Sequence, residues 1–79
     1  MSDQAYWTIR VLWGAKIYAD APEHIRERLS AHYPTYVGAH ESALVVTQWA
    51  RIPLRRVKID CRDPFVEALI ASRQHPRRP

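Results

Sequence analysis

Four histidines and one cysteine are the side chains in this sequence best suited to metal binding or nucleophilic catalysis. They stand far apart, at His24, His32, His40, Cys61 and His75. No CxxC, HxxxH or HExxH spacing occurs among them and no carboxylates cluster around a histidine, so neither a metal site nor a bound cofactor is predicted. Cys61 continues the apolar alternation of the residues before it, which indicates a buried, inert thiol. We therefore expect a protein that is not an enzyme.

Basic side chains are concentrated in the second part of the chain. Residues 51–79 hold eight basic and three acidic side chains, whereas residues 1–50 hold four and five, for a net charge of +4. Ten of the twelve cations are arginines, whose planar guanidinium suits carboxylates, phosphates and aromatic faces. The densest part is opposed only by Asp60. We predict that its cations form the binding surface: Arg51, Arg55, Arg56, Lys58 and Arg62.

Two classes of partner fit such a surface. The first is an acidic patch on a protein or on a protein–nucleic-acid complex, since Trp, Tyr and Arg dominate the energetics of protein interfaces. The second is nucleic acid bound directly. In that case Arg56 and Lys58 would follow phosphates from one strand face, and Trp49 and Tyr6 would stack on bases. Alternatively, the tryptophans fill a core that is short of other large residues.

Period-two alternation predicts strands over residues 5–13 and 54–61, with Gly14 as a bulge after which residues 16–18 extend the first strand. Residues 43–50 are ambiguous. Val45, Val46 and Thr47 are stiff at χ1 and favour a strand, which is our prediction. The helical alternative would put a different set on one face: Leu44, Val45, Gln48, Trp49 and Ile52. In that alternative a helix-turn-helix forms, with Gly38 in the turn and residues 54–61 as a wing.

Two cap-and-proline pairs predict helices. Asp20 with Pro22 opens one that ends near His32, and Asp63 with Pro64 opens another that ends near Gln74. The order is thus β-α-β-β-α, with the first two strands parallel across a crossover helix and the last two in a hairpin. The predicted core combines the apolar faces of these elements: Trp7, Ile9, Val11, Ile25, Leu29, Val57, Ile59, Phe65 and Leu69.

These elements make an α/β (α+β) fold class: a three-stranded sheet with two helices on one face. With 79 residues, the chain has room for one domain, which we place at residues 1–74, followed by a flexible basic tail at residues 75–79. A lone cysteine fits a reducing compartment. The absence of a long apolar run predicts no membrane association, and the polar start does not resemble a signal peptide, so a cytoplasmic location is expected.

Two families offer resemblances. Gly38-Ala39-His40 loosely resembles the Gly-Ser-His that precedes a strand in HicA-type messenger-RNA interferases, which would imply a toxin ribonuclease with His40 as general acid–base. In size and texture the whole chain resembles small anti-CRISPR proteins, although no motif supports this and many such inhibitors are acidic. That resemblance implies a non-enzymatic inhibitor that docks on a protein or nucleoprotein complex and blocks its binding of nucleic acid. The inhibitor is our leading hypothesis, followed by a nucleic-acid-binding domain and then the ribonuclease.

Overall fold

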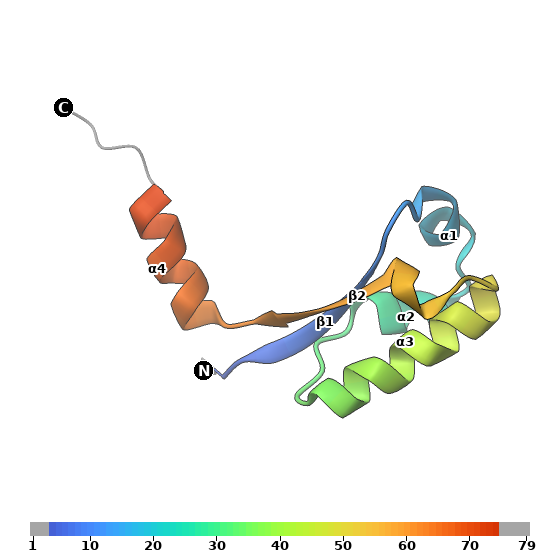
Figure 1. Ribbon diagram of the computed structural model, residues 1–79, viewed down its shortest axis with the longest axis horizontal. Coiled ribbons are helices and arrows are strands. Elements are labelled where there is room, and N and C mark those ends of the chain that lie inside the picture. The colour runs from blue at the N-terminus through green and yellow to red at the C-terminus, as the bar shows by residue number, and fades with distance from the viewer. Residues whose placement is uncertain (1–3, 75–79) are drawn as a thin grey trace.

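The computed structural model describes residues 4–74, so the predicted tail at residues 75–79 lies outside the described residues. The fold is a small α+β arrangement in which a two-stranded ribbon packs against helices (Figure 1). The elements in chain order are β1 (Tyr6–Val11), α1 (Ala15–Asp20), α2 (Glu23–Ser30), α3 (Tyr36–Ala50), the 3₁₀ turn η1 (Leu54–Arg56), β2 (Val57–Arg62) and α4 (Pro64–Gln74).

The described sheet has two antiparallel strands, so the predicted three-stranded sheet with a parallel pair is wrong. Val11 pairs with Val57 and Ile9 with Ile59, which puts the alternating apolar side chains of both strands on the face toward α2 and α3. Beside β1, where a third strand was expected, there is a single bridge. There the Trp7 and Tyr33 amides donate to each other's carbonyl oxygens at 2.7 and 2.8 Å.

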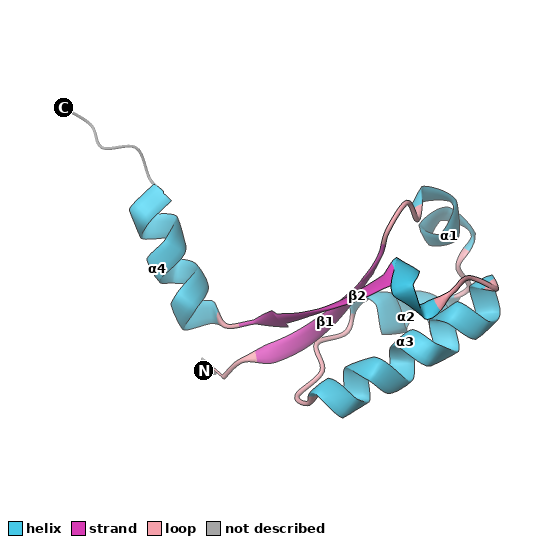
Figure 2. Cartoon of the chain, viewed as in Figure 1, coloured by secondary structure: helices cyan, strands magenta, loops and turns pink. Residues whose placement is uncertain are grey.

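Residues 43–50 belong to α3, so the strand prediction is wrong and the helical alternative holds (Figure 2). Thr35 caps the helix, because its Oγ1 accepts a hydrogen bond from the Gly38 amide at 3.1 Å. The buried side recurs at helical spacing and is made of small or β-branched residues, which lets α3 approach the ribbon closely. This side consists of Ala39, Ser42, Ala43, Val46 and Thr47. Leu44, Gln48 and Trp49, which the helical alternative puts on one face with Val45 and Ile52, are exposed.

The segment between β1 and α3 also differs from expectation. Residues 16–18 lie in α1 and do not extend the strand. Gly14 precedes this helix, and there is no room for a larger residue, because an added Cβ would lie 2.9 Å from the Val11 Cβ. The predicted cap Asp20 instead forms an ion pair with Lys16 at 3.1 Å, and α2 begins after Pro22.

The predicted core is confirmed in the body and wrong at α4. Four of the predicted residues are buried, namely Ile9, Val11, Ile25 and Val57, and three more are partly buried against them, namely Trp7, Leu29 and Ile59. Phe65 and Leu69 are 66% and 51% exposed, because α4 starts where predicted but projects from the end of β2 instead of covering the sheet (Figure 1). Cys61, expected to be buried, is exposed for the same reason.

Candidate binding surface

The face of the β-ribbon that points away from α2 and α3 is basic. Arg10 lies directly opposite Lys58, and Arg62 lies opposite Tyr6 near the end of the ribbon. These three cations are exposed, whereas the acidic Asp60 on the same face is half-buried. Two like charges placed directly opposite each other on an antiparallel pair destabilise it. The ribbon therefore carries a repulsion that an anionic partner would relieve.

Only part of this charge is neutralised within the chain. Asp60 lies 3.5 Å from Arg10, measured from Oδ2 to Nε. Arg62 donates a hydrogen bond to the carboxylate of Glu67 on α4, and this bond, together with the charge of Glu67, raises the pKa of Arg62. Lys58 has neither a hydrogen bond nor an ion pair with any side chain in the described range 4–74.

The five predicted binding residues thus divide into cations that have a partner within the described chain and cations that have none. Arg51 and Arg55 lie at the corner between α3 and β2, both exposed and both, like Lys58, without a side-chain partner among the described residues. Arg62 is paired with an acid. Arg56 does not stand beside Lys58 on a strand face as expected, because it lies in the 3₁₀ turn and its guanidinium is turned toward the backbone of the β1–α1 connection. Arg10 completes the basic face and was missed, although its place opposite the apolar alternation of β1 was visible.

The Arg56 guanidinium holds the turn that displays Trp13. Its Nη2 donates to the carbonyl oxygens of Leu12 and Trp13, both at 2.9 Å. Trp13 has a φ of 51°, in the left-handed region that a bulky side chain rarely adopts, and is 83% exposed. A conformation of this kind costs of order 1–2 kcal/mol, and strained residues cluster at binding and catalytic sites. The turn therefore points to Trp13 as a functional residue that the sequence analysis did not find.

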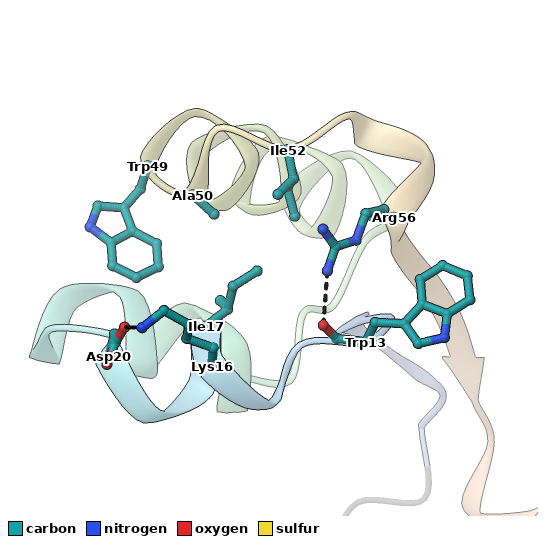
Figure 3. Close-up of a pocket in the computed structure, with 8 residues that line it drawn as sticks. All are labelled: Trp13, Lys16, Ile17, Asp20, Trp49, Ala50, Ile52 and Arg56. Atoms are coloured by element: carbon teal, nitrogen blue, oxygen red, sulfur yellow. Dashed lines mark hydrogen bonds and ion pairs between the residues drawn. The ribbon is translucent and has the colours of Figure 1, made fainter.

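Trp13 stands at one end of an open pocket of about 410 Å³ between α1 and the end of α3. Trp49 stands at the other end, and Ile17, Ala50 and Ile52 provide the apolar part of the lining (Figure 3). The polar rim is made by the Lys16–Asp20 ion pair and by Arg56. The pocket thus has an apolar floor, the Trp49 indole on one side and the Arg56 guanidinium on the other, with the Trp13 indole projecting outward beside it (Figure 3). Such a pocket is suited to a large apolar side chain that enters from an acidic surface.

The candidates for chemistry do not come together. Within residues 4–74 no three His, Cys, Asp or Glu side chains are grouped so that they could hold a metal ion. His40 lies in α3 with its ring 5.9 Å from that of Tyr36, and the Gly38-Ala39-His40 sequence is helical, not the approach to a strand that the interferase resemblance needs. His32 stacks on Tyr6 at 4.1 Å between ring centroids.

The helix-turn-helix alternative is not supported by the composition of α3. A recognition helix presents basic or amide side chains to phosphates and base edges. The sequence of α3 contains no Lys or Arg, and its exposed residues are Tyr36, Val37, Glu41, Leu44, Gln48 and Trp49. Gly38 lies inside the helix and not in a turn, and β2 pairs with the strand that precedes all the helices, so it is not a hairpin wing.

Comparison of the chain with known protein families, with curated proteins and with solved structures gave no match. No helix in the described part of the chain is both long and apolar enough to cross a membrane.

Proposed function

We propose that this protein is a non-enzymatic binding module that docks on an acidic surface of a protein or nucleoprotein complex. The observation that carries the proposal is the strained, exposed Trp13, which the Arg56 guanidinium holds at the edge of an apolar pocket. Tryptophan and arginine are the commonest residues at the energetic centre of protein interfaces. Trp13 would insert into the partner, and a large apolar side chain of the partner would enter the pocket.

The cations around this anchor select an acidic partner. Ile52 and Arg56 line the pocket, and each is preceded in the sequence by a further arginine, Arg51 and Arg55. Lys58 follows on β2. Arginine binds carboxylates through paired hydrogen bonds. A domain that covers such a surface would act as an inhibitor, which is the role that the resemblance to small anti-CRISPR proteins implies. The cytoplasm, where a free thiol such as Cys61 stays reduced, is the compartment that we propose for it.

Selection from a displayed peptide library tests this proposal directly. We expect enrichment of peptides with one large apolar or aromatic residue among Asp and Glu, and loss of their binding in Trp13→Ala. The double variant Arg55→Glu/Lys58→Glu should weaken binding at least tenfold without lowering the melting temperature, because both side chains are exposed and unpaired among the described residues. Arg26→Glu, an exposed position on α2, is the matched control.

Direct nucleic-acid binding is the competing outcome. Labelled single-stranded and duplex DNA and RNA, titrated at several salt concentrations, should bind weakly and with no dependence on Trp13. Tight binding with a steep linear dependence of log affinity on log salt would overturn the proposal in favour of a nucleic-acid-binding domain. His40→Ala and Cys61→Ser should leave peptide binding intact. A binding defect in either variant with unchanged folding would place that residue in the binding surface, contrary to the proposal.

A further inference from the structure

The helix α4 carries an apolar stripe that the rest of the described chain does not cover. The stripe residues are 44–66% exposed, and of the α4 side chains that the structure describes only Pro64 and Glu67 are half-buried. The stripe consists of Phe65, Val66, Leu69 and Ile70. These four residues recur at i, i+1, i+4 and i+5, which aligns them along one side of the helix. Taking about 200 Å² for a large apolar residue, they expose roughly 400 Å², which is within the size range of the largest apolar patch on a typical monomer, and such a patch is often functional.

The junction with β2 holds α4 away from the body. The Asp63 carboxylate accepts hydrogen bonds from the amides of Phe65 and Val66 at 3.0 and 3.4 Å, and Arg62 on β2 pairs with Glu67 in the first turn of the helix. The molecule is consequently 50 Å long and 26 Å wide, with a radius of gyration of 15.1 Å, whereas a compact chain of this length has about 12 Å. The stripe is therefore left for another molecule.

The helix also lacks the support that a helix of its length needs. It has 11 residues, and isolated helices shorter than about 12–15 residues are marginal in water. In a folded chain the missing stability comes from packing of the apolar side. An unpacked α4 would therefore fray, and a partner on the stripe would stabilise it.

We propose that the partner is a second copy of this chain, whose α4 packs antiparallel to the first. The stripe is uncharged in its middle, is preceded by the acidic Asp63 and is followed on the same side by the basic Arg73. A two-fold axis through its centre places Phe65 against Ile70 of the other copy and Arg73 beside Asp63 of the other copy. Apolar meets apolar, opposite charges meet at both ends, and the helix dipoles run antiparallel.

The size of the stripe sets the strength of this association. Two stripes together bury roughly 800 Å², which is below the 1,200 Å² or more of a stable interface and within the range of weak, transient ones. We therefore expect a dimer that forms in the micromolar range and dissociates on dilution. The surface is separate from Trp13 and its pocket, so the dimer and the proposed binding function can fail independently.

Sedimentation equilibrium of the full chain across the micromolar range tests the proposal. The mean mass of the parent should rise with concentration from 9.2 kDa toward twice that value, and its far-ultraviolet helical signal should rise with it. Leu69→Gln/Ile70→Gln keeps helix-forming side chains but removes the stripe, so it should dimerise at least tenfold more weakly. Ala71→Gln, on the opposite side of α4 by the 3.6-residue repeat, should behave as the parent does.

The charge arrangement gives a second variant. Arg73→Glu leaves the apolar stripe intact but places an acid beside Asp63 of the other copy, so it should weaken the dimer several-fold, and added salt should reduce this difference. A parent that stays monomeric throughout would overturn the proposal, and scattering that gave a compact radius near 12 Å would show that α4 covers its own body. A Leu69→Gln/Ile70→Gln protein that dimerises as tightly as the parent would place the interface elsewhere and overturn it equally.

Discussion

The Trp13 turn and α4 both present large apolar side chains to solvent, but they are held in opposite ways. Trp13 is fixed by backbone-directed hydrogen bonds from Arg56 and by the close approach of Gly14 to Val11, at a cost in backbone strain. Among the described residues, the contacts that hold the α4 stripe are a cap and one exposed ion pair at the first turn of the helix. An apolar group that is rigid before binding loses little entropy on binding and suits a specific foreign partner. An unsupported helix instead gains its own stability from association, which a second copy can supply.

The largest difference between the Trp13 turn and α4 should be in how much an arginine contact at each contributes to the free energy of unfolding. Arg56→Gln deletes charged hydrogen bonds to two carbonyls within the folded body, so we expect it to lower the free energy of unfolding by about 2 kcal/mol. Arg62→Gln deletes an exposed, solvent-screened pair with a helix outside the core, so its loss of stability should be much smaller than that of Arg56→Gln. Urea unfolding of both variants at a concentration where the chain is monomeric measures the difference. Equal losses would mean that α4 is part of the cooperative unit.

The turn also depends on Gly14, and the next test uses the chain's two glycines. In Gly14→Ala the new Cβ would lie 2.9 Å from the Cβ and Cγ1 of Val11, so the turn must shift, at about 1.5 kcal/mol by analogy with overpacked sites. In Gly38→Ala the nearest atom is Thr35 Oγ1 at 3.3 Å, and alanine is the better helix former, so stability should change little or rise. Thermal melts of both variants check this, and a destabilised Gly38→Ala alone would contradict it.

The outline of the ribbon could be read from the sequence, since alternation identified Ile9, Val11 and Val57 as core residues. The α3 segment could not, because the strand preference of Val46 and Thr47 is outweighed by their burial on the side that α3 packs against the ribbon. The misplaced third strand then led to the wrong parallel topology. The stripe on α4 was visible, but a stripe indicates that something covers it and does not say what.

The candidate site, like the fold, could be predicted from the sequence only in part. Local density of charge found Arg51, Arg55 and Lys58, which the structure leaves unpaired among the described residues. It could not show that Arg56 is used internally, because its carbonyl partners lie 43 and 44 positions earlier in the chain. Trp13 was not predicted as a functional residue, because a left-handed tryptophan contradicts the conformational preference on which sequence interpretation depends.

The strain at Trp13 can be measured with two substitutions that both remove the indole. Trp13→Gly fits the left-handed backbone without a Cβ, whereas Trp13→Ala keeps the penalty, so the glycine variant should be the more stable of the two by about 1 kcal/mol. Both should lose peptide binding. Chemical unfolding with a calorimetric check would establish the order. An alanine variant at least as stable as the glycine variant would mean that the turn relaxes in solution, and the contrast with α4 would disappear.

The smallest effect belongs to the basic face of the ribbon, where Arg10 and Lys58 stand opposite each other. Lys58→Gln removes one of the two like charges and leaves the exposed stem of the side chain in place. We expect it to stabilise the chain by about 0.3 kcal/mol, or roughly 1–3 °C in melting temperature for a domain of this size. The same substitution should weaken binding of acidic peptides, because the repulsion in the free protein is what an anionic partner relieves. In Arg10→Gln the repulsive pair is already absent. Adding Lys58→Gln to that variant should therefore bring no further gain in stability. A Lys58→Gln protein that loses stability would instead show that Lys58 interacts with Asp60 in solution. The charges of the ribbon face would then be neutralised within the chain, and no repulsion would be left for an anionic partner to relieve.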